Sequence, residues 1–179
     1  MKTLVIHPKD YSTDFLKPIY EGKGYTVIDT YLKPHKLKQE MLKYDKIMMM
    51  GHGTPNGLLN VFPGSFAAYL IDHSFVDILS QKECVYIWCN ADIFVKQHNL
   101  KGFYTGMIIS EMGEAWIYNI NASYQEINDS NTLFADSVKK ALESTEPVKF
   151  MKESYYSIEN PVIEFNSQNI YSTQEILTD

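Results

Sequence analysis

The chain has 179 residues, enough for one domain with a substantial buried core. Hydrophobic residues make up 45% of it and charged residues 21%, which is the composition of a globular protein and excludes extensive disorder. The formal net charge is −6, and all 16 basic residues are lysine. Nucleic-acid-binding proteins usually present a basic face with arginine side chains that contact phosphates and guanines, so we expect no nucleic-acid partner.

Short apolar segments alternate with helical segments over the first two-thirds of the chain, a pattern typical of parallel strands joined by helices. The segments are apolar throughout, as in strands that helices cover on both faces. The predicted strands are Thr3–His7, Tyr25–Thr30, Lys46–Met50, Cys84–Cys89, Gly106–Ser110 and Trp116–Ile120. The sequence therefore predicts an α/β fold: a three-layer α/β/α sandwich around a mainly parallel six-stranded sheet.

Helices are predicted between and after these strands, from apolar spacing and capping residues. They are Ser12–Glu21, Leu37–Lys43, a helix that begins at Ser74, a short helix after Asp92, and Asn131–Glu143. Residues 146–179 are rich in Ser, Asn and Tyr around two prolines, and we expect an extended tail or an edge hairpin there. The whole chain, 1–179, is then a single domain.

The two cysteines, Cys84 and Cys89, lie in one predicted strand. A strand rises about 3.3 Å per residue, so their Cα atoms are about 16 Å apart and cannot be bridged by a disulfide. No segment reaches the roughly 20 apolar residues of a membrane span, and the N-terminal segment is too short in apolar residues for a secretion signal. We therefore expect a cytoplasmic protein with free thiols and no membrane partner.

Two predicted strands end in side chains that can react together. One ends in Met50-Gly51-His52-Gly53 and the other in Trp88-Cys89. The carboxyl ends of parallel strands lie on one edge of a sheet, where catalysis usually occurs, and neighbouring strands are only about 4.8 Å apart. Cys89 could then attack as a thiolate, with His52 as base and the backbone N–H groups of Gly53 and Cys89 holding the oxyanion. This chemistry needs neither a metal nor a cofactor.

An apolar strand ending in His-Gly, followed some tens of residues later by an apolar strand ending in cysteine, resembles the caspase-like cysteine peptidases. That group includes caspases, metacaspases, gingipains, legumains and separases. Gly57-Leu58-Leu59 after the histidine, the segment 106–110 after the cysteine and a later helix follow a similar order, so the resemblance covers roughly residues 1–145. It implies a caspase-like fold, a peptide or protein substrate, His52 as catalytic histidine, Gly53 in the oxyanion hole and Cys89 as nucleophile.

Substrate preference is predicted from the acidic residues at the same edge. Caspases in the narrow sense select aspartate with arginine side chains, and this chain has no arginine. Asp10 follows the first strand and Glu111 the fifth. A carboxylate there would attract a cation, so we expect substrate binding by Asp10 or Glu111 and a preference for a basic residue before the scissile bond.

Other functions remain open at this stage. The same architecture without catalysis would be an interaction or regulatory module, with Cys89 as a buried structural thiol. The segment from Gly51 to Gly57 could be a phosphate loop, but its glycine spacing differs from the dinucleotide pattern and Pro55 interrupts the helix that should follow. A zinc site from Cys89, Asp92, His52 and His98 lacks any recurrent ligand spacing.

Overall fold

A six-stranded sheet forms the middle of the protein in the computed structural model, which describes residues 1–62, 68–156 and 158–173. In spatial order the strands are β2 (Thr26–Ile28), β1 (Thr3–Ile6), β3 (Lys46–Met50), β7 (Glu83–Ile87), β8 (Phe103–Thr105) and β9 (Ile170–Ser172). The first five are parallel, and β9 runs antiparallel to β8. The predicted α/β fold with a mainly parallel six-stranded sheet is therefore confirmed.

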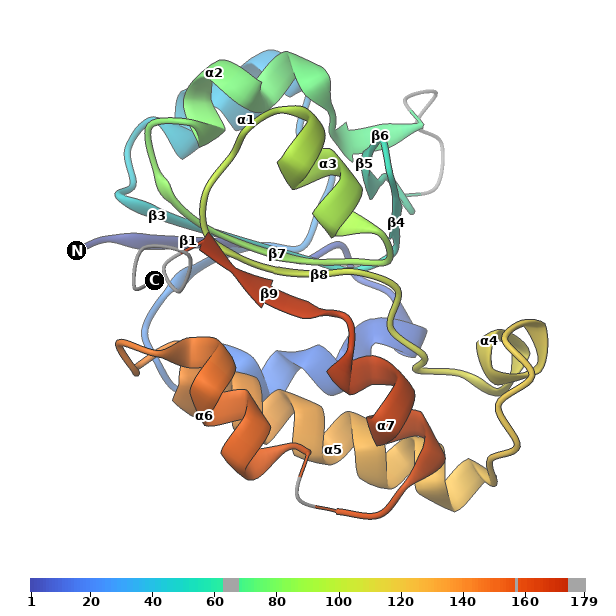
Figure 1. Ribbon diagram of the computed structural model, residues 1–179. Coiled ribbons are helices and arrows are strands. Elements are labelled where there is room, and N and C mark those ends of the chain that lie inside the picture. The colour runs from blue at the N-terminus through green and yellow to red at the C-terminus, as the bar shows by residue number, and fades with distance from the viewer. Residues whose placement is uncertain (63–67, 157, 174–179) are drawn as a thin grey trace.

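Helices cover both faces of this sheet (Figure 1). On one face lie α1 (Pro34–Met41), α2 (Val76–Leu79) and α3 (Ala91–Gln97). On the other lie η1 (Tyr11–Ile19), α5 (Tyr124–Ala141), α6 (Pro147–Ser154) and α7 (Pro161–Ser167). Each face has its own apolar cluster, one containing Leu37 and Phe94 and the other containing Leu16 and Phe134. The strands are apolar on both faces because both are buried.

A small second sheet lies beyond the carboxyl end of β3. It is antiparallel and consists of β4 (Gly53–Thr54), β5 (Gly57–Leu59) and β6 (Tyr69–Ile71), followed by the short helix η2 (His73–Phe75). In Figure 1 this sheet and α4 (Met112–Ile117) lie at the edge where the parallel strands end. The segment from Gly51 to Gly57 is therefore a strand and a turn, not a phosphate loop that opens a helix.

Two predicted strands are wrong. The fifth parallel strand is β8, and the chain leaves the sheet at Gly106, whose N–H donates to Asn169 and whose carbonyl accepts from Asn90. Ile108 and Ile109, which follow it, are buried outside the sheet. The segment predicted as the strand Trp116–Ile120 begins within α4, and its Trp116 is 68% exposed. An apolar segment alone does not separate a strand from an exposed helix.

The predicted helix starts and the C-terminal tail also need correction. The long helix begins at Tyr124, seven residues before the predicted start, because Ser123 and Glu126 form a capping box. Asp72, rather than Ser74, caps the helix after β6. Residues 147–154 and 161–167 are helical rather than extended, and only β9 matches the predicted edge pairing. Residues 157 and 174–179 of that tail lie outside the described residues.

Candidate active site

The ends of β3 and β7 bring His52 and Cys89 to one place. The two strands are adjacent and parallel, with Met50 paired with Ile87, and the N–H of Gly51 donates to the Ile87 carbonyl at 3.0 Å. His52 and Cys89 each lie two residues beyond a paired residue. Neighbouring strands are about 4.8 Å apart, so this register roots the two side chains opposite each other, and both line one pocket.

The turn that carries Cys89 is fixed by its neighbours on both sides. Asn90 adopts a left-handed conformation (φ 65°) and begins the turn into α3. Thr105 on β8 donates its hydroxyl to the Trp88 carbonyl at 3.0 Å. The Trp88 indole packs against Gly53 and donates to the Thr54 carbonyl at 3.2 Å. Trp88 therefore joins the turn of Cys89 to the strand that follows His52.

Gly53 is required by this packing as well as by any oxyanion role. A Cβ atom at position 53 would lie 2.0 Å from Cδ1 of Trp88, which is 2% exposed and cannot move away freely. We expect Gly53→Ala to lower the free energy of unfolding by about 1–3 kcal/mol, the usual cost of overpacking. Thermal or denaturant unfolding measures it.

The matched control for this variant is Gly113→Ala on α4, where an added Cβ would meet nothing within 4 Å. Alanine is the better helix former, so this variant should keep or slightly raise the stability. Equal effects of the two substitutions would contradict the packing role of Gly53.

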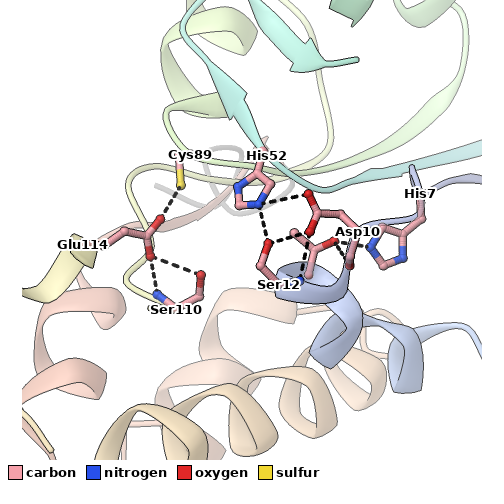
Figure 2. Close-up of polar contacts among 8 residues, drawn as sticks. His7, Asp10, Ser12, His52, Cys89, Ser110 and Glu114 are labelled. Atoms are coloured by element: carbon pink, nitrogen blue, oxygen red, sulfur yellow. Dashed lines mark hydrogen bonds and ion pairs between the residues drawn. The ribbon is translucent and has the colours of Figure 1, made fainter. Parts of the chain in front are cut away.

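His52 is oriented by a short chain of hydrogen bonds that ends at a carboxylate (Figure 2). Ser12 donates its hydroxyl to Asp10 Oδ1 at 2.9 Å, and the Ser12 oxygen is 2.6 Å from His52 Nε2. The second oxygen of Asp10 is 3.7 Å from the same nitrogen. Because the Ser12 proton is directed to Asp10, the serine oxygen accepts from Nε2–H. The geometry therefore assigns the proton of the neutral imidazole to Nε2.

The remaining nitrogen of His52, Nδ1, lies on the side of the ring that faces Cys89 (Figure 2). In the assigned tautomer this nitrogen carries the free lone pair, which is what a general base needs. The Asp10 carboxyl that anchors the chain is itself ionised. Burial alone would raise its pKa, but the hydrogen bonds from Ser12 and the nearby His52 outweigh burial and hold that pKa below its usual range.

The thiol of Cys89 is half-buried and points toward the loop that leads to α4. It donates to the Ile108 carbonyl at 3.6 Å and faces Oε1 of Glu114 at 3.9 Å. Burial, together with the negative charge of Glu114, raises the pKa of Cys89 to about 11. The resting site thus holds a protonated thiol rather than a preformed thiolate.

Glu114 is held in place firmly. Its second oxygen accepts hydrogen bonds from the N–H groups of Ser110 and Glu111 at 2.7 and 3.1 Å, and from the Ser110 hydroxyl at 3.2 Å. The loop before it is fixed by the buried Asn166 on α7, which donates to the Ile109 carbonyl and accepts from the Ile109 N–H. The C-terminal helices therefore help to position the groups around Cys89.

The predicted substrate-binding residues have other neighbours. Asp10 belongs to the hydrogen-bond chain of His52, and its Oδ1 accepts from both the N–H and the hydroxyl of Ser12. Glu111 is exposed at the start of α4. Ser12 and Glu114 are not among the site residues predicted from the sequence. The Asp-x-Ser pattern of a capped helix start and the Glu-x-x-Glu spacing of a capping box were the signals that could have indicated them.

Comparison with known proteins adds no family to this picture. A scan against models of known protein families and a search of the curated proteins both found no match.

Within residues 1–62, 68–156 and 158–173, no group of three or more His, Cys, Asp or Glu side chains could hold a metal ion. None of the helices in these ranges has the length and apolar character needed to cross a membrane.

Proposed function

We propose that the protein is a cysteine hydrolase of the caspase-like type that cleaves peptide amides through Cys89 and His52. The observation that carries this proposal is the register of β3 and β7, which brings the two side chains to the ends of adjacent parallel strands and into one pocket. Strand ends of this kind are the usual catalytic edge of α/β sheets. The sequence resemblance over roughly residues 1–145 supports the same assignment.

The proposed reaction begins with proton transfer from the Cys89 thiol to Nδ1 of His52. The sulfur attacks the scissile carbonyl carbon, and the negative charge on the carbonyl oxygen is held by backbone N–H groups at Gly53 and Cys89. The imidazolium then gives its proton to the departing amine, which leaves an acyl thioester on Cys89. Water attacks the thioester with His52 again as base, and the carboxylic acid and free thiol are released. Asp10, through Ser12, stabilises the imidazolium.

A second candidate is a catalytically inactive interaction module on the same architecture. The observation in its favour is the environment of Cys89, whose thiol donates to Ile108 and faces the carboxylate of Glu114. The negative charge of Glu114 stabilises the protonated form of the thiol. The two candidates differ in whether His52 accepts the thiol proton of Cys89, and the reactivity of the thiol measures this directly.

Alkylation by iodoacetamide distinguishes the two candidates. Cys84 is 1% exposed, so in a hydrolase Cys89 should react much faster than Cys84, and His52→Ala should slow Cys89 by about tenfold or more. Mass spectrometry of the two cysteine peptides at successive times gives both rates. If Cys89 reacts no faster than Cys84, or if its rate is unchanged in His52→Ala, the hydrolase proposal is wrong and the module is favoured.

A further inference from the structure

The pocket beside Cys89 is lined almost entirely by uncharged groups. It is a half-open pocket with a volume of about 30 Å³ between η1, the ends of β3, β7 and β8, the loop before α4, and α5. Its apolar walls come from Phe15, Leu16, Ile87, Ile108 and Phe134. Among the described residues that line the pocket, only His52 and Cys89 carry titratable side chains.

The hydroxyl groups in the pocket wall already have partners within the protein. Thr13 is bonded to His7 at 3.0 Å and to the Asp10 carbonyl at 3.1 Å. Thr105 donates to the Trp88 carbonyl. Ser110 donates to Glu114. A polar group entering the pocket would lose its water and gain no equivalent hydrogen bond from these hydroxyls, so the pocket favours an apolar occupant.

The acidic side chains near the pocket, Asp10, Glu111 and Glu114, either have hydrogen-bond partners or face solvent. Asp10 is bonded to Ser12 and directed at His52, and Glu111 is exposed at the start of α4. Glu114 accepts three hydrogen bonds on one oxygen and faces the thiol with the other. A lysine or arginine head group placed among the apolar walls would be a buried cation without a free counter-charge, which is strongly unfavourable.

We propose that this pocket binds the substrate residue that carries the scissile carbonyl, and that it selects a small uncharged apolar side chain. The inference rests on the proposed hydrolase function and replaces the basic preference expected from the sequence. Since Cys89 lines the pocket, the side chain next to the attacked carbonyl is the one that reaches it. A water molecule needs about 10–15 Å³ of such a cavity, so the volume of about 30 Å³ admits a small side chain of two or three heavy atoms.

Peptidyl chloromethyl ketones that differ only in the residue bearing the ketone test the pocket. Each forms a bond from Cys89 Sγ to the methylene carbon, with loss of chloride and transfer of the thiol proton to His52. We expect the alanine probe to modify Cys89 at least about tenfold faster than the lysine or aspartate probe, because discrimination in such pockets is of this order or larger. The leucine probe should also be slower than the alanine probe. Mass spectrometry of the Cys89 peptide gives the rates.

A pocket variant and a matched control complete the test. Phe15→Ala enlarges the cavity and should raise the rate with the leucine probe relative to the alanine probe. Phe150, on α6, packs against the same apolar cluster as the pocket residues Leu16 and Phe134 but does not line the pocket. Phe150→Ala should therefore leave the ratio of the leucine-probe rate to the alanine-probe rate unchanged. The probe series with the unmodified protein decides the inference even if Phe15→Ala fails to fold.

The outcomes separate this inference from the function on which it rests. If Cys89 is modified fastest by the lysine or aspartate probe, the apolar pocket is wrong while the hydrolase stands. If no probe modifies Cys89 faster than iodoacetamide does, the proposed hydrolase function is overturned, and the pocket assignment with it.

Discussion

Replacing His52 by alanine should slow hydrolysis of a fluorogenic peptide pool by about 10²- to 10⁴-fold, the range that a positioned general base and acid contributes. The reason is that His52 must accept the thiol proton of Cys89 and later protonate the leaving amine. The protonated resting thiol, with its pKa raised to about 11, makes the base more necessary than it would be for a preformed thiolate. Initial rates at neutral pH measure the effect.

Cys89→Ala should remove the activity entirely, and His35→Ala provides the control. His35 is exposed on α1, so its loss removes an imidazole without touching the strand ends. A His52→Ala variant that keeps more than about a third of the original rate would contradict the role of His52 as base.

Glu114→Gln should raise the reactivity of Cys89 at neutral pH by about tenfold or more. The carboxylate at 3.9 Å from the sulfur disfavours the thiolate, and an uncharged amide of the same shape removes that repulsion, so the pKa of Cys89 should fall. Below the thiol pKa the thiolate fraction rises tenfold for each unit by which the pKa falls. Alkylation rates measured from pH 7 to 10 should show the rising limb displaced toward lower pH.

Glu111→Gln is the matched control, since Glu111 immediately precedes the same short helix, carries the same charge and is exposed. It should leave the pH profile of Cys89 alkylation in place. If Glu114→Gln leaves the profile unchanged, or moves it toward higher pH, the carboxylate does not control the thiol. The same variant also loses charge on the oxygen that accepts from Ser110, so a melting curve should accompany it.

The sequence was sufficient for four of the six strands and for the adjacency of the two strands that precede His52 and Cys89. Continuous apolar segments at Lys46–Met50 and Cys84–Cys89 predicted two buried parallel strands, and their adjacency followed from their order along the chain. The placement of His52 and Cys89 at one edge is a consequence of that pairing, because each residue follows its strand by the same number of residues. The positions of these strands are predicted from local sequence, because a short continuous apolar segment indicates a buried strand.

The sequence was insufficient where long-range contacts decide the structure. Glu114 faces Cys89 at the end of a loop that is bound by Asn166, 57 residues beyond Ile109. The helices at 147–154 and 161–167 each begin at a proline. The two prolines favour an extended chain in the sequence-based prediction, but proline is also well suited to the first turn of a helix. The pocket likewise combines residues from five separate segments, so its apolar character could not be predicted from the acidic residues near it.

The antiparallel strand β9 has a consequence for how the molecule meets its neighbours. Without it, β8 would be an open edge, and an open edge offers backbone N–H and C=O groups to any other extended chain. β9 pairs with all three residues of β8, and Tyr171 stacks on Tyr104 over that pairing. The C-terminal segment therefore supplies the edge strand on this side of the sheet, so that β8 is paired on both sides. The edge that the protein presents there to other chains is thus set by a segment that is distant in sequence from β3 and β7.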